Sequence, residues 1–170
     1  MLANHIVERI EFAVEDGVKT IDLAELFPPR RPFPQRELVE AGERGLYDQV
    51  QVDSEVEVRF VENHLKPDTK VLFYFKFPPA FRVHFPKVIG NYNPDWGIAR
   101  YDETGKLILQ LIRETKGTQD QKKLQFPQEG RKIECAHKYF KALHLDYRHI
   151  TDETPGWWLP DDIQQASLGM

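Results

Sequence analysis

The sequence predicts an α/β domain in which helices flank a mixed central sheet, with elements in the order helix, three strands, helix and strand. Three runs rich in β-branched and aromatic residues lie between residues 71 and 115. An amphipathic segment precedes them, and a second amphipathic segment and a short final run follow them. The chain has 170 residues, of which 41% are hydrophobic, so it is long enough to bury one core.

The first helix is predicted to begin after Asp53 or Ser54, because either side chain can cap a helix. The apolar residues that follow at helical spacing are Val56, Phe60, Val61 and Leu65. The sequence Lys66-Pro67-Asp68 ends the helix, since proline cannot continue it.

Three strands follow this helix. Residues 71–77 (VLFYFKF) form the first, which Pro78-Pro79 ends. Residues 96–101 and 107–115 form the next two, and the stretch DETGK between them is typical of a hairpin connection. The third strand has apolar residues on both faces, which indicates a central position in the sheet.

The second helix is predicted at residues 131–145, where Ile133, Ala136, Phe140 and Leu143 form one apolar stripe. A last strand follows at residues 146–150. We expect residues 46–152 to form the domain and residues 153–170 to form a C-terminal tail. Trp157 and Trp158 are expected to pack this tail onto the domain.

The first 45 residues are predicted to form an irregular lead-in arm or linker. The stretch LFPPRRPFP contains four prolines, which discourage both helix interiors and central strands. Before it, Asp16-Gly17 is typical of a turn, so a short hairpin is expected there.

Several observations restrict the class of protein. No run of about 18 apolar residues occurs, which argues against a membrane-spanning helix. Glu8 and Glu11 interrupt the segment in which a signal peptide needs an apolar core. Cys135 is the only cysteine, so no internal disulfide can form. Together these features predict a cytoplasmic protein.

The net charge of −4 conceals an uneven distribution. Residues 1–69 carry 8 Lys/Arg and 15 Asp/Glu, whereas residues 70–150 carry 15 Lys/Arg and 8 Asp/Glu. A basic middle section indicates either an anionic partner or a solvated basic face, and charge alone does not distinguish the two. Its candidates for contact with the phosphates of such a partner are Lys122, Lys123, Lys132 and Lys138.

Two charged motifs, NPDWG at residues 93–97 and ETKG at residues 114–117, flank the predicted hairpin. Asp95 begins one strand and Glu114 ends its antiparallel partner, so both are expected at the same end of the sheet. Side chains alternate along a strand, so Lys116 points to the same face as Glu114. Two close carboxylates repel each other, and a divalent cation such as Mg²⁺ neutralises them. With Lys116 beside the attacking water, this set suits phosphodiester hydrolysis.

The order of these residues resembles the PD-(D/E)xK nuclease motif, with Pro94-Asp95 as its leading pair and Glu114-Thr115-Lys116 as its second half. Over about residues 45–150, the sequence is similar to the carboxy-terminal endonuclease domain of type III restriction enzyme Res subunits. The segments that carry the similarity are ERGLYDQVQVDSE, SEVEVRFVENHL, VLFYFKFPPAF, VIGNYNPDWGIA, LIRETKG and RKIECAHKYFKAL. The D…ExK pattern alone is weak, but NPDW, ETKG and KIECA in this order are specific.

The resemblance implies a restriction-endonuclease-like αβββαβ core and a Mg²⁺-dependent endonuclease that cuts double-stranded DNA, with Mn²⁺ able to replace Mg²⁺. It implies that Asp95 and Glu114 are metal ligands, that the Thr115 carbonyl completes the site, and that Lys116 is the catalytic lysine. In related nucleases a glutamate on the first helix often helps to hold the metal. Glu57 is the first candidate for this role and Glu55 is the second.

The sequence departs from the family in one respect. A Res subunit also carries a helicase motor, and this chain has no GxxxxGK[ST] phosphate loop. We therefore expect either a stand-alone relative or an excised domain, whose complex would include a helicase/ATPase region and a modification methyltransferase subunit. Two alternatives stay open: a nuclease of the same fold that acts on junctions or RNA, and a nucleic-acid-binding or assembly module that is silent without a motor domain.

Overall fold

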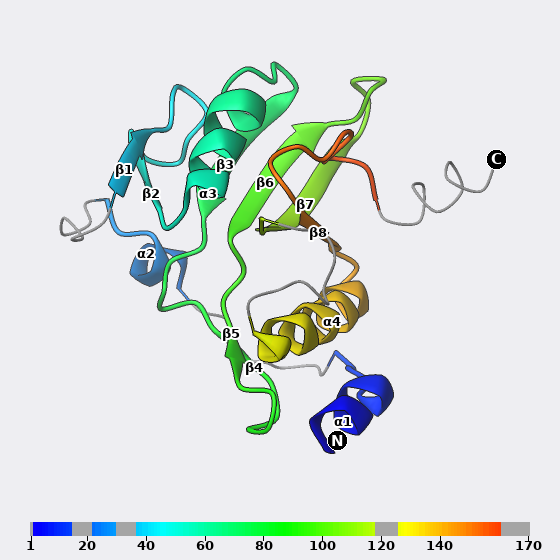
Figure 1. Cartoon of the computed structure of the whole chain (residues 1–170). Coiled ribbons are helices and arrows are strands. Elements are labelled where there is room, and N and C mark those ends of the chain that lie inside the picture. Colours follow the sequence, from blue (N-terminus) through cyan, green and yellow to red (C-terminus); the bar gives the residue numbers. More distant parts are fainter. Residues whose placement is uncertain (1, 15–21, 30–36, 118–125, 161–170) are drawn as a thin grey trace.

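A computed structural model describes residues 2–14, 22–29, 37–117 and 126–160 (Figure 1). A four-stranded sheet with the order β3-β6-β7-β8 forms its centre. The strands are β3 (Val71–Lys76), β6 (Trp96–Tyr101), β7 (Ile108–Thr115) and β8 (Asp146–Ile150). Neighbours among β3, β6 and β7 are antiparallel, whereas β8 runs parallel to β7. The predicted mixed sheet and α/β class are therefore confirmed.

Helices lie beside this sheet at the predicted places in the chain. The first is α3 (Glu55–Phe60), which continues into a π-helical turn, η1 (Val61–Leu65). Its cap is Ser54, whose hydroxyl accepts a hydrogen bond from the Glu57 N–H at 3.3 Å. The second helix, α4 (Pro127–Ala142), connects β7 to β8.

The bounds of α4 differ from the prediction at both ends. It begins at Pro127 rather than residue 131, because proline is well suited to the first turn, where its missing N–H is not needed. It ends at Ala142 rather than residue 145, since His144 adopts a left-handed conformation with φ of 57°. This backbone reversal leads directly into β8.

Smaller elements surround the sheet. They are α1 (Leu2–Arg9), α2 (Leu23–Leu26), the antiparallel pair β1 (Glu37–Glu40) and β2 (Gln49–Val52), and the antiparallel pair β4 (Val83–His84) and β5 (Asn91–Tyr92). Helix α1 lies beside α4 (Figure 1), where the Lys138 ammonium donates to the Val7 and Glu8 carbonyls at 2.7 and 3.0 Å. The first residues are therefore helical rather than irregular. The hairpin expected at Asp16-Gly17 lies outside the described residues.

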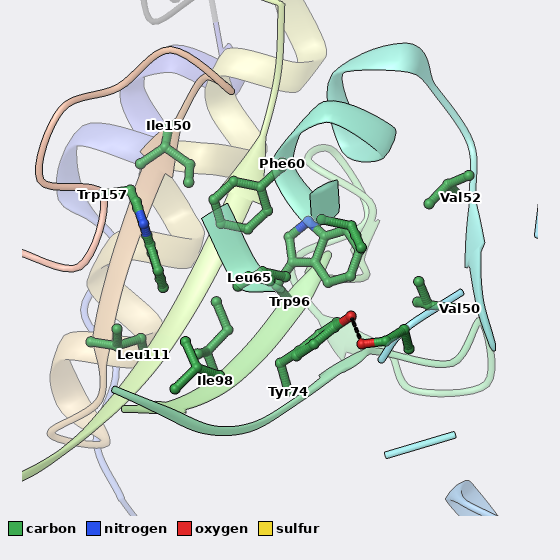
Figure 2. Close-up of a cluster of buried hydrophobic side chains, with 13 residues drawn as sticks. Val50, Val52, Phe60, Leu65, Tyr74, Trp96, Ile98, Leu111, Ile150 and Trp157 are labelled. Carbon is green, nitrogen blue, oxygen red and sulfur yellow. Dashed lines mark hydrogen bonds between the residues drawn. The ribbon is translucent and has the colours of Figure 1, made fainter. Parts of the chain in front are cut away.

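Two apolar clusters cover the two faces of the sheet. Because side chains alternate along strands, Tyr74, Trp96, Ile98 and Leu111 share one face, which packs against α3 and η1. Figure 2 shows Phe60 between Trp96 and Trp157, with ring centroids 5.8 and 5.4 Å away. On the other face, Ile112 and Tyr147 pack against Ile133 and Phe140 of α4. No helix in the described ranges is both long enough and apolar enough to span a bilayer.

The chain after β8 packs against the first face of the sheet and is held there by buried arginines. Arg113 donates through Nε to the Trp157 carbonyl at 2.7 Å, and Arg148 donates through Nη1 to the Gly156 and Leu159 carbonyls at 3.0 and 3.1 Å. Trp157 is only 1% exposed, which confirms that the tryptophans pack onto the domain. The core thus extends beyond residue 153, while the predicted domain limits themselves stay predictions.

Gly97 allows an unusually close approach within the sheet. It pairs with Phe75 of β3, and a Cβ added at Gly97 would lie 2.4 Å from the Phe75 ring atom Cζ. The Phe75 ring therefore lies directly over the Gly97 backbone. Any side chain at position 97 would push this ring away.

Candidate active site

The two motifs predicted to meet at one end of the sheet do so. Trp96 of β6 pairs with Arg113 of β7, so one more step of this antiparallel register places Asp95 opposite Glu114. The Asp95 carboxylate is fixed by Thr115, whose N–H and hydroxyl both donate to Oδ2, at 2.8 and 3.0 Å. The Trp96 indole donates in turn to the Thr115 hydroxyl at 3.1 Å. Both strand ends are thus locked together beside the carboxylate.

Glu114 is buried, with 4% of its surface exposed, and both of its carboxylate oxygens are engaged. The Tyr92 hydroxyl donates to Oε2 at 2.6 Å, and the Lys116 ammonium contacts Oε1 at 3.1 Å. Lys116 therefore shares a face with Glu114, as the alternation of side chains predicts. The Tyr92 hydroxyl also lies 2.9 Å from the Tyr147 hydroxyl, so a tyrosine of β5 and one of β8 support the carboxylate.

The electrostatics of this pair are dominated by burial. Desolvation, and next the charge of Asp95, raise the pKa of Glu114 to about 8. Burial alone would lower the pKa of Lys116, but the charges of Glu114 and Asp95 raise it well above its usual value. Lys116 is therefore an ammonium at neutral pH.

The raised pKa of Glu114 predicts that the stability of the protein depends on pH. Its folded-state pKa of about 8 lies above the ordinary value of 4.5, so the folded chain holds this proton more tightly than the unfolded chain. The stabilisation is complete below pH 4.5 and is lost as the pH rises through about 8. In EDTA, the free energy of unfolding should fall by roughly 2–4 kcal/mol more in the parent protein than in Glu114→Gln over this window.

Urea unfolding at several pH values checks this prediction. Glu134, an exposed glutamate of α4, offers the matched control, and Glu134→Gln should follow the parent. Parallel pH profiles for the parent and Glu114→Gln would contradict the raised pKa of Glu114.

A third carboxylate approaches from α3. Glu57 is 5% exposed, and its Oε2 accepts hydrogen bonds from the Asp53 N–H at 2.8 Å and from the Lys76 ammonium. Burial, and next the charge of Asp95, raise the pKa of Glu57. Glu55 is exposed to solvent instead. The structure thus turns Glu57 rather than Glu55 toward the cluster, and a metal-binding role for Glu57 stays a prediction.

The donor set suits a hard divalent cation. Among the described residues, no three Asp, Glu, His or Cys side chains are arranged as a ready metal-binding group. Mg²⁺ needs only one or two carboxylates and completes its shell with water and other oxygens, for which Asp95, Glu114 and the Thr115 carbonyl suffice. Burial is the main cause of the raised pKa values of Glu57 and Glu114, and the negative charge of Asp95 is the second; a bound cation would offset both.

Of the four predicted DNA-binding lysines, the structure describes Lys132 and Lys138. Lys138 donates to the carbonyls of α1, as described above. Lys132 lies near Gly90, on the loop before β5, where a Cβ would be 3.6 Å from its Cε. Lys122 and Lys123 lie outside the described residues. Their contacts with DNA stay predictions.

Three site residues escaped prediction from the sequence: Lys76, Tyr92 and Tyr147. Lys76 ends a strand in which every neighbour is apolar, and Tyr92 stands three positions before Asp95. No spacing rule connects either residue with a carboxylate, because their contacts arise from tertiary packing.

Comparison with known proteins adds one finding. A family model described as Endonuclease domain matches residues 43–153, which is more than half of the chain. No curated protein and no solved structure matches. The matched range contains Glu57, Asp95, Glu114 and Lys116. The chain therefore belongs to the Endonuclease domain family, with a restriction-endonuclease-like fold.

Proposed function

We propose that this chain is a metal-dependent endonuclease domain that hydrolyses phosphodiester bonds in double-stranded DNA, similar to the cleavage domain of type III restriction enzyme Res subunits. One observation carries the proposal: Asp95, Glu114 and Lys116 meet at the end of paired strands in a chain of the Endonuclease domain family. Under this proposal, a helicase/ATPase region and a modification methyltransferase subunit would act with it in a larger complex.

Asp95 and Glu114 would hold the metal through carboxylate oxygens. When bound, Mg²⁺ would neutralise charge on the scissile phosphate and supply an activated water. Thr115 keeps one oxygen of Asp95 in place, so Oδ1 is the oxygen left to face a ligand. Tyr92 orients Glu114 by the bond to Oε2.

Lys116 would act on the phosphate and the water rather than on the metal. Its side chain is 29% exposed, so the ammonium can reach a substrate while it stays 3.1 Å from Glu114 Oε1. As a protonated group it donates hydrogen bonds and offers no lone pair to a cation. It can therefore orient the attacking water and stabilise negative charge that develops on the phosphate.

Cleavage of plasmid DNA tests the proposal. The parent protein with Mg²⁺ and without ATP should convert supercoiled plasmid to the nicked form, and EDTA should abolish the conversion. Asp95→Ala should bind metal poorly and leave the plasmid intact. Mn²⁺ binding without nicking by the parent protein would contradict autonomous cleavage and favour the module that is silent without a motor domain.

DNA binding should depend steeply on salt and little on sequence, because phosphate contacts release counterions. Charge reversal of Lys122 and Lys123 in the basic middle section should weaken binding more than reversal of Arg30 and Arg31. Fluorescence anisotropy with a labelled duplex at several salt concentrations measures both effects. Equal losses for the two double variants would show that the basic middle section is not the binding surface.

A further inference from the structure

Lys76, the last residue of β3, lies in the centre of the acidic cluster without belonging to the family motif. Its ammonium contacts Glu57 Oε2, and it lies 2.8 Å from Asp53 Oδ2. The side chain is only 12% exposed, and its Nζ lies 5.9 Å from the centre of the Trp96 ring. The charge of Asp95 also acts on this ammonium. Lys76 thus contacts two carboxylates and feels the charge of a third.

The site contains two lysine–glutamate pairs on either side of Asp95. Lys76 pairs with Trp96 across β3 and β6 and shares the face of Tyr74, whereas Glu114 shares the opposite face with Ile112. The charge of Asp95 acts on both Glu57 and Glu114. Lys76 therefore neutralises the carboxylates on one side of the sheet end, and Lys116 those on the other.

The formal charges of the four carboxylates and two lysines at this site do not balance. Asp53, Glu57, Asp95 and Glu114 carry four negative charges when ionised, against two positive charges on Lys76 and Lys116. The difference of two is the charge of one divalent cation. A buried carboxylate without a counter-ion is strongly destabilising, so Lys76 is needed at Glu57 while no cation is bound.

The Lys76 side chain has space into which it can move. It lines a cavity of about 1060 Å³ between β3 and the β1–β2 hairpin, together with Asp53, Phe77, Arg82 and Asn93. An ammonium that leaves Glu57 can thus turn into this cavity and keep its contact with Asp53.

We infer that Lys76 is a positioning residue that occupies the Glu57 side of the site as an internal counter-ion, and that a divalent cation entering beside Asp95 displaces it from Glu57. This inference rests on the proposed metal site. While Lys76 is bound to Glu57, this carboxylate cannot act as a metal ligand. The same contact keeps the metal-free protein folded. It therefore weakens metal binding while it stabilises the unliganded protein.

Calorimetric titration with Mn²⁺ tests the inference. Lys76→Met should bind Mn²⁺ about tenfold more tightly than the parent protein, because a competing positive charge beside the site is removed. Its melting temperature in EDTA should fall, and saturating Mn²⁺ should raise it by more than in the parent. Lys70, just before the other end of β3, pairs with Glu103 and is the matched control. Lys70→Met should bind Mn²⁺ as the parent does.

A measurement on the parent protein covers the case in which Lys76→Met does not fold. Reductive methylation followed by mass spectrometry reports the accessibility of each lysine. Mg²⁺ should increase methylation of Lys76 several-fold and leave that of Lys70 unchanged. Equal Mn²⁺ affinity in the parent and Lys76→Met, or unchanged Lys76 methylation in a protein that binds Mn²⁺, would overturn the counter-ion role alone. Absence of Mn²⁺ binding in both proteins would overturn the metal site as well.

Discussion

Lys116→Ala should cut DNA about 10²–10⁴ times more slowly than the parent protein while its affinity for Mn²⁺ stays the same or rises. The lost ammonium acts on the water and on developing phosphate charge, which explains the loss of rate. It offers the metal no lone pair, and its removal takes a positive charge away from the cation. Calorimetric Mn²⁺ titration, together with single-turnover cleavage of a plasmid substrate, separates the two effects.

Asp95→Ala provides the contrast for this experiment, since it should lose both Mn²⁺ affinity and cleavage. If the isolated chain does not cut DNA, the comparison requires a substrate and a helicase-fused protein with which the parent does cut. A Lys116→Ala protein that cuts at nearly the parent rate would remove this lysine from the mechanism.

The second large effect is on stability and concerns Trp157, which lies outside residues 43–153, the range that the family model matches. Trp157→Ala should lower the free energy of unfolding by about 3–5 kcal/mol, because a fully buried indole in contact with Phe60 is replaced by a cavity. The neighbouring Trp158 is half-buried, and the Arg100 guanidinium lies over its ring, with the guanidinium carbon 4.2 Å from the ring centroid. Trp158→Ala should therefore cost only about 1 kcal/mol.

Truncation extends the same argument to the backbone. A chain that ends at Glu153 loses Trp157 together with the carbonyl acceptors of the buried Arg113 and Arg148. Two buried guanidinium groups would then lose hydrogen bonds, so we expect no cooperative unfolding transition. A chain that ends at Pro160 keeps Trp157 and these carbonyl acceptors and should unfold cooperatively. Urea denaturation followed by circular dichroism makes the comparison, and a cooperative transition in the shorter chain would contradict it.

The sequence predicted those features that depend on local pattern. The helix after Ser54, the three antiparallel strands and the last strand follow from periodicity and capping residues, and the structure has them in this order. The meeting of Asp95 with Glu114 follows from hairpin geometry, since a hairpin brings the start of one strand to the end of the next. Glu57 is the first candidate and Glu55 the second from the sequence; on α3 Glu57 is buried and Glu55 is exposed, while a metal-binding role for Glu57 stays a prediction.

Features that depend on distant contacts were not predicted. The buried Arg113 and Arg148 looked like parts of a basic surface in the charge count, yet they hold the chain after β8. No strand is predicted between residues 78 and 95, where the structure has the short strands β4 and β5; their buried residues belong to the same apolar cluster as those of α4, a contact that their own pattern does not reveal. Tyr92 belongs to this region, so its bond to Glu114 could not be inferred from spacing.

Gly97 has a consequence for how sequences of this family can diverge. The Phe75 ring packs over Gly97 where β3 pairs with β6, close to the strand ends at which Lys76 and Asp95 lie. A mutation at position 97 would therefore be tolerated only if position 75 also changed to a smaller residue. Among descendants that share this site, we expect glycine at 97 and an aromatic residue at 75 to be inherited together and lost together.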